Sequence, residues 1–156
     1  FVILFFFVFF SIGVTAEVLP SLVFEGNCTN SQNPLIEAAN NVTLNSQLLF
    51  CSTLCPCGLT QEAINKANYS KTDMFIINAK SKINGGPVRF QDCDLTKKYE
   101  QNERDAMTVL QSIESAFECS GWCGDPNSYV WPLYSFSDVN FGKPKVACYD
   151  TMKTKL

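Results

Sequence analysis

Eight cysteines are spread through most of this 156-residue chain, and the chain contains no histidine. An even number of cysteines in an exported chain of this size predicts a fold that disulfides hold together. The lack of histidine excludes Ser-His-Asp and Cys-His catalytic groups, and it excludes histidine as a metal ligand. The disulfide candidates are Cys28, Cys51, Cys55, Cys57, Cys93, Cys119, Cys123 and Cys148.

The chain opens with an apolar segment, because Phe1 to Ala16 carries no charge and all 12 Lys/Arg and 15 Asp/Glu follow it. One interpretation is the end of a transmembrane helix over residues 1–19 whose beginning is missing, since the chain starts with Phe1 inside an apolar run. The other is the apolar part of a signal peptide cleaved after Ala16. The density of aromatic and β-branched residues favours the membrane helix. A soluble core helix fits less well, since the polar body offers little to enclose it.

Three glycosylation sequons support export of the body, residues 20–156; they begin at Asn27, Asn41 and Asn68. Metal binding is the competing use of cysteine, with ligands from 51–57 and 119–123. Structural zinc sites usually pair their cysteines at regular short spacings, whereas here three cysteines fall within seven residues and others stand alone. We therefore expect disulfides, no metal site and no cofactor.

Hydrophobic periodicity predicts a mainly helical body. Asn33-Pro34 resembles a helix N-cap followed by proline at the first position. Residues 96–117 repeat apolar side chains at spacings of three, four and seven, which indicates an amphipathic helix. Gly121 follows shortly afterwards, as is usual where a helix ends. The predicted helices cover residues 34–50, 60–67, 96–117 and 146–155.

One segment is predicted to be extended. Residues 73–79 read DMFIINA, and Gly85-Gly86-Pro87 breaks the chain before a second short apolar piece at 88–90. We expect these two pieces to pair as a small hairpin.

Aromatic side chains gather near the end of the chain. Such rings anchor protein contacts at low entropic cost, but they also fill the cores of small domains, and both interpretations stay open. The candidate partner contacts are Trp122, Tyr129, Trp131, Tyr134 and Phe136.

Paired carboxylates are the remaining route to catalysis. Asp92 with Asp94, or Asp125 with Asp138, contain the residue types for acid and base chemistry. Nothing selects either pair, and acids just before a predicted helix favour its N-terminus. We therefore expect no catalytic residue and no small-molecule substrate. The net charge of -3 and the scattered bases also argue against a nucleic-acid partner.

Three segments together resemble a known family. They are CSTLCPC at 51–57, FECSGWC at 117–123, and FSDVNFGKP at 136–144 followed by Cys148. With an apolar helix before them and a helix after, they are similar to the third membrane helix and large extracellular loop of a divergent, protist-type tetraspanin, and the resemblance covers nearly the whole chain. The family signature is Cys-Cys-Gly, whereas Ser120 stands at its second position here. The resemblance implies that Cys123 takes over that role and that Cys119 pairs with Cys148.

The implied fold is mainly α, with a transmembrane helix followed by a disulfide-stapled helical extracellular loop domain that ends before a missing fourth membrane helix. The implied function is a non-catalytic, multi-pass membrane scaffold with an extracellular or lumenal body. Its partners would be the lipid bilayer, other membrane proteins and further copies of itself. The alternative is a secreted disulfide-rich binding protein with a cleaved signal peptide. A basic, Met-initiated segment upstream and no later membrane span would indicate that alternative.

Overall fold

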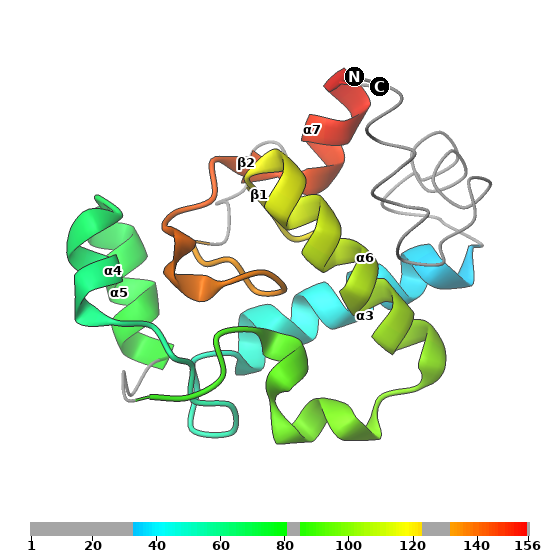
Figure 1. The fold of residues 1–156 in the computed structure, drawn as a ribbon, viewed down its shortest axis with the longest axis horizontal. Helices are drawn as coiled ribbons and strands as arrows, with labels where there is room; N and C mark the ends of the chain where they lie inside the picture. The colour runs from blue at the N-terminus through cyan, green and yellow to red at the C-terminus, as the bar shows by residue number, and fades with distance from the viewer. Residues whose placement is uncertain (1–32, 81–84, 123–131, 156) are drawn as a thin grey trace.

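The computed structural model describes residues 33–80, 85–122 and 132–155. They form a mainly helical body with short 3-10 helices and a two-stranded sheet (Figure 1). Within those ranges no helix is long and apolar enough to cross a membrane; the predicted transmembrane segment 1–19 lies outside them. The elements are α3 (Pro34–Leu49), α4 (Gln61–Lys66), α5 (Lys71–Lys80), η1 (Phe90–Asp92), η2 (Asp94–Lys98), α6 (Gln101–Phe117), β1 (Cys119–Ser120), η3 (Val139–Phe141), β2 (Val146–Ala147) and α7 (Cys148–Lys155).

Helix α3 confirms the predicted helix over 34–50. The Asn33 side chain accepts a hydrogen bond from the Leu35 N–H at 2.9 Å, and Pro34 occupies the first helical position. Such a cap stabilises a helix by about 1 kcal/mol. At the other end Cys51 adopts a left-handed φ of 61°, which turns the chain out of the helix into the cysteine-rich segment.

Helix α6 confirms the amphipathic helix and its predicted end at Phe117, but it begins later than predicted. It begins at Gln101, where Glu100 and Glu103 form a capping box, and not at Thr96. The Thr96 hydroxyl instead donates to the Cys93 carbonyl oxygen inside the 3-10 segment. Glu118, with a φ of 53°, provides the left-handed residue at the C-terminus. The left-handed residue that terminates the helix is therefore Glu118, and not Gly121 as the sequence had suggested.

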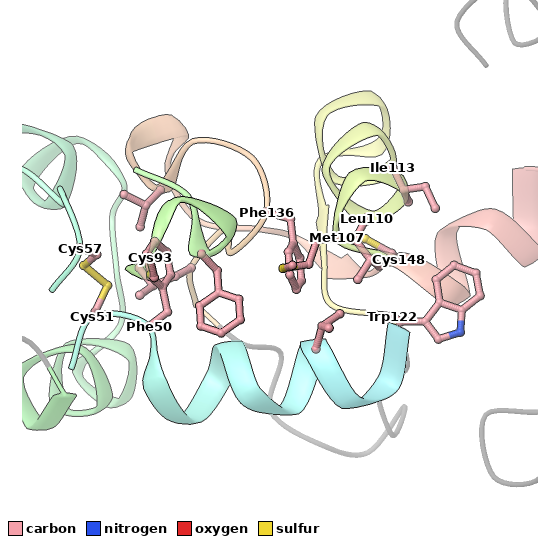
Figure 2. Close-up of a cluster of buried hydrophobic side chains, with 14 of the residues drawn as sticks. Phe50, Cys51, Cys57, Cys93, Met107, Leu110, Ile113, Trp122, Phe136 and Cys148 are labelled. Atoms are coloured by element: carbon pink, nitrogen blue, oxygen red, sulfur yellow. A yellow bond between two sulfur atoms is a disulfide. The ribbon is translucent and has the colours of Figure 1, made fainter. Parts of the chain in front are cut away.

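Helices α3 and α6 cross, and the main core lies between them (Figure 1). Ala106, Val109, Leu110 and Ile113 of α6 are buried. Figure 2 shows Met107, Leu110 and Phe136 in the space between the two helices. Further along the core, the rings of Phe50, Phe90 and Phe136 meet edge to face with centroids about 6 Å apart. This packing joins three segments that are distant in the sequence.

The prediction that residues 73–79 are extended is wrong, because they lie within helix α5. The Ser70 N–H donates to Asp73 Oδ2 at 2.8 Å, and the Asp73 N–H donates back to Ser70 Oγ at 3.1 Å. This reciprocal cap starts a helix, and the apolar run then continues as helix. The short helix predicted over 60–67 is confirmed as α4, with the Thr60 side chain as its cap.

The predicted hairpin between 73–79 and 88–90 is also wrong, because the second piece bonds to a later segment. The Phe90 N–H donates to the Ser135 carbonyl oxygen at 2.7 Å, and the Val139 N–H donates to the Val88 carbonyl oxygen at 2.9 Å. The two strands pair in parallel with Cys119 opposite Val146. The last helix is confirmed as α7, although Val146 lies in β2 before it.

Candidate functional site

Three disulfides join cysteines within the part of the chain that the structure describes. Cys51 bonds to Cys57 and Cys55 bonds to Cys93, so both bonds fasten the segment that follows α3 (Figure 2). The third joins Cys119 at the end of α6 to Cys148 at the start of α7, which is the pairing that the resemblance implies. Cys28 and Cys123 lie outside the described residues. Each bond is buried, so these cysteines provide structure and not a reactive thiol surface.

The described acids that were considered for catalysis are engaged in ion pairs or in helix capping. Asp92 pairs with Arg89 at 2.8 Å, and Asp94 pairs with Lys97 at 2.6 Å. The hydrogen bond from Lys97 holds the pKa of Asp94 below its usual value. Asp138 caps η3 by accepting from the Asn140 N–H, while Asp125 lies outside the described residues. The part of the chain that the structure describes also contains no acidic or cysteine cluster suited to a metal ion.

Glu114 is a buried carboxylate that the sequence reasoning missed. Its Oε2 accepts from the Phe136 and Ser137 N–H groups at 2.9 Å each, and from the Ser137 hydroxyl at 3.1 Å. Its Oε1 accepts longer bonds from the N–H groups of Gly121 at 3.5 Å and Ser135 at 3.4 Å. Burial raises its pKa to about 7, and the hydrogen bonds partly oppose that rise. Glu114 thus fixes the 135–137 segment on α6.

A second group of polar contacts attaches α5 to the segment after η3. Asp73 is fully buried and binds Lys143 Nζ at 2.5 Å. Nearby, the Tyr69 hydroxyl donates to the Gly142 carbonyl oxygen at 3.3 Å. Burial, and then the Asp73 charge, raise the pKa of Tyr69 to about 12. These contacts attach α5 and the turn before it to the segment that follows η3.

The aromatic candidates that the structure describes belong to the core. Trp122 and Phe136 are almost fully buried, and Tyr134 is 5% exposed. Trp122 lies near Cys148 beside the α6–α7 disulfide (Figure 2). Tyr129 and Trp131 lie outside the described residues. Of the two interpretations left open by the sequence, core packing therefore applies to Trp122, Tyr134 and Phe136.

The exposed apolar surface lies elsewhere. Leu44 and Leu48, on the outer face of α3, are 58% and 66% exposed, and Leu54 in the disulfide-closed loop is 70% exposed. Phe75 on α5 and Phe141 on η3 are also exposed. Contiguous exposed apolar side chains are typical of contact surfaces, and Leu44 and Leu48 lie one turn apart on α3. The exposure of Leu44 and Leu48 could have been predicted from the sequence, since both fall on the face of the helix opposite to its buried stripe.

Two of the three sequons can be placed. Asn41 is exposed on α3, but the sequon's Thr43 is buried and its hydroxyl accepts from the Trp122 N–H at 3.3 Å. Asn68 and Ser70 are both exposed in the turn before α5. Asn27 lies outside the described residues. Folding thus leaves the Asn68 sequon accessible and covers part of the Asn41 sequon.

Comparison with known proteins returns no family. No protein-family model, no curated protein and no solved structure matches this chain. The tetraspanin resemblance therefore stays a prediction.

Proposed function

We propose that this chain is part of a non-catalytic integral membrane scaffold of tetraspanin type. In this proposal, residues 1–19 anchor the chain in the bilayer, and the body lies on the extracellular or lumenal side. The body would hold other membrane proteins, or further copies of itself, in place.

The observation that carries the proposal is the disulfide between Cys119 and Cys148. It joins the Cys-x-Gly turn after the long helix α6 to the first residue of α7, as expected for the loop that the resemblance implies. Buried disulfides are stable in oxidising compartments and rare in the cytosol. The disulfide-bonded body and the uncharged segment 1–16 therefore both support an extracellular or lumenal location for the body.

The body also has the physical properties that a scaffold needs. Disulfides restrain the segment after α3 and the junction of α6 with α7. This surface is therefore preorganised, and it would lose little conformational entropy when a partner binds. Leu54 projects from a loop that both Cys51–Cys57 and Cys55–Cys93 restrain. This loop is our leading candidate for the surface that contacts a partner membrane protein.

Alkaline carbonate extraction of the protein expressed from its complete reading frame tests the anchor. We expect the protein to stay with the membrane and N-terminal sequencing to find the Phe1 segment still attached. Val8→Arg is the matched variant: it places a charge that costs about 3 kcal/mol in this helix, but the further membrane helices of a multi-pass scaffold should still retain the protein, and release of this variant would indicate a single anchor. Recovery in the soluble fraction with a new N-terminus near Glu17 would contradict the scaffold and support the secreted binding protein.

Photo-crosslinking in intact membranes tests the contact. A crosslinking amino acid at position 54 should form adducts with membrane proteins or with a second copy. The same amino acid at Lys98, an exposed position in the charged η2 segment, is the control and should form few. Equal labelling from both positions would show that the loop is not a specific contact.

A further inference from the structure

The outer face of α3 is unusual for a helix that borders solvent. Asn41, Leu44 and Leu48 follow one another at spacings of three and four, so they share one face. All three are exposed, with Leu44 at 58% and Leu48 at 66%. Glu37, four residues before Asn41, is exposed on this same face and is the only charged residue in the helix. A solvent-facing helix surface normally carries charges, and an apolar pair left open promotes association.

Asn41 begins the sequon Asn41-Val42-Thr43 on this same face. Leu44 lies about 4.5 Å and Leu48 about 10 Å further along the helix axis. Helical side chains lean toward the N-terminus, so Leu44 leans toward the turn that holds Asn41. Sugars attached to Asn41 would extend from the exposed face, and they would not enter the core, which lies on the opposite side with Val42 and Ser46.

The folded chain does not offer this sequon to a transferase, since the Thr43 hydroxyl is buried against the Trp122 N–H. During synthesis, however, the sequon is accessible to the transferase. Trp122 follows Thr43 by 79 residues, which takes several seconds at about 5–20 residues per second. A lone 16-residue helix such as α3 is only marginally stable in water. The sequon therefore passes through an accessible state before α6 and Trp122 arrive to pack on it.

We propose that Asn41 carries an N-linked glycan whose first sugars cover Leu44 and Leu48, and that this cover keeps the outer face of α3 from associating with other copies of the chain. The apolar C–H faces and acetyl methyl groups of these sugars suit leucine side chains. Their hydroxyls add to the polar surface that Glu37 alone provides among the charged residues of this face. The inference rests on export of the body, which the proposed function supplies.

The test is site occupancy in the full chain produced in secretory cells. Peptide mass analysis after enzymatic deglycosylation in ¹⁸O-labelled water marks each occupied asparagine, because its amide is hydrolysed to an aspartate that carries the heavy oxygen. We expect Asn41 to be occupied in the wild type. Thr43→Ser keeps both the sequon and a hydroxyl for Trp122, so it should also be occupied, whereas Thr43→Val should lose the glycan.

Self-association then tests the covering role. Asn41→Gln should associate about tenfold or more tightly than the wild type, because uncovering two leucines exposes that much apolar area. Adding Leu44→Gln and Leu48→Gln should reverse the effect. Asn68→Gln, which removes a sequon elsewhere, is the matched control. Because Asn41→Gln could fold poorly, trimming the glycans of the folded wild-type protein to a single sugar gives a second measurement, and it should raise association in the same direction.

The outcomes separate this inference from the proposed function. Occupancy at Asn68 with none at Asn41 would overturn the inference and leave export intact. No occupancy at any sequon would overturn it and also count against export. An occupied Asn41 whose removal leaves association unchanged would refute the covering role.

Discussion

Replacing Glu114 with glutamine should remove most of the pH dependence of this protein's stability between pH 5 and 8. The side chain is fully buried and its pKa rises from 4.5 to about 7 on folding, mainly through burial. The chain has no histidine, so no other side chain has an ordinary pKa in this window. A glutamine oxygen in place of Oε2 keeps the hydrogen bonds to Phe136 and Ser137, and the substitution loses the longer ones on Oε1.

The direction in which the free energy of unfolding changes with pH follows from proton binding. Because the pKa of Glu114 is higher in the folded chain, the folded state holds its proton at pH values where the unfolded state has released it. The resulting stability is fully present below pH 4.5 and is lost as the pH rises through about 7. With 1.36 kcal/mol for each unit of pKa, the wild type should lose about 2–3 kcal/mol between pH 5 and 8.

Urea unfolding of the oxidised chain, followed by tryptophan fluorescence at several pH values, measures this slope. Glu114→Gln should be destabilised by about 1–3 kcal/mol at pH 5, where it leaves buried donors facing each other, and should change little from pH 5 to 8. Glu118→Gln, an exposed neighbour that pairs with Lys145, is the control and should keep the wild-type slope. A wild type that is more stable at pH 8 than at pH 5, or a variant with the same slope, would refute the reasoning.

Three other variants probe the body. Replacing both Cys119 and Cys148 by alanine should lower the free energy of unfolding by about 3–4 kcal/mol, because the bond closes a loop with a sequence separation of 29; an unchanged urea midpoint would contradict this. Lys143→Met should cost about 1–3 kcal/mol, since it removes the Lys143 cation that lies 2.5 Å from the buried Asp73 carboxylate, and amide exchange in α5 should accelerate. Gly86→Ala should cost about 2 kcal/mol or more in the same urea assay, because a Cβ there would lie 2.0 Å from a backbone carbonyl oxygen.

Local sequence signals predicted much of the helical body. The Asn33-Pro34 start of α3 and the Thr60 start of α4 each depend on a side chain within a few residues of the bond it makes. The amphipathic stripe of α6 likewise reflects a single helix face. The Ser70 and Asp73 pair that begins α5 was equally local, and reading it as a cap would have corrected the extended prediction for 73–79.

The surroundings of Glu114 and of the aromatic side chains could not be predicted from sequence, because they depend on which distant segments meet in the folded chain. Glu114 follows Leu110 by four residues, so the stripe of α6 placed a charge on the buried face. The donors that satisfy it come from a segment more than 20 residues away, and periodicity does not identify such partners. In the same way, the aromatic side chains offered either a core or a contact, and burial of Trp122 and Phe136 decided between them.

The number of cysteines, the oxidised character of the body and its helical class were decided by residue type and short-range pattern, because those properties need no knowledge of distant neighbours. The pairing of Cys55 with Cys93, the exposure of Leu44 and Leu48, and the attachment of α5 through Asp73 and Lys143 were decided by tertiary structure. Each of these requires two segments to approach closely. That approach depends on the packing of the whole core.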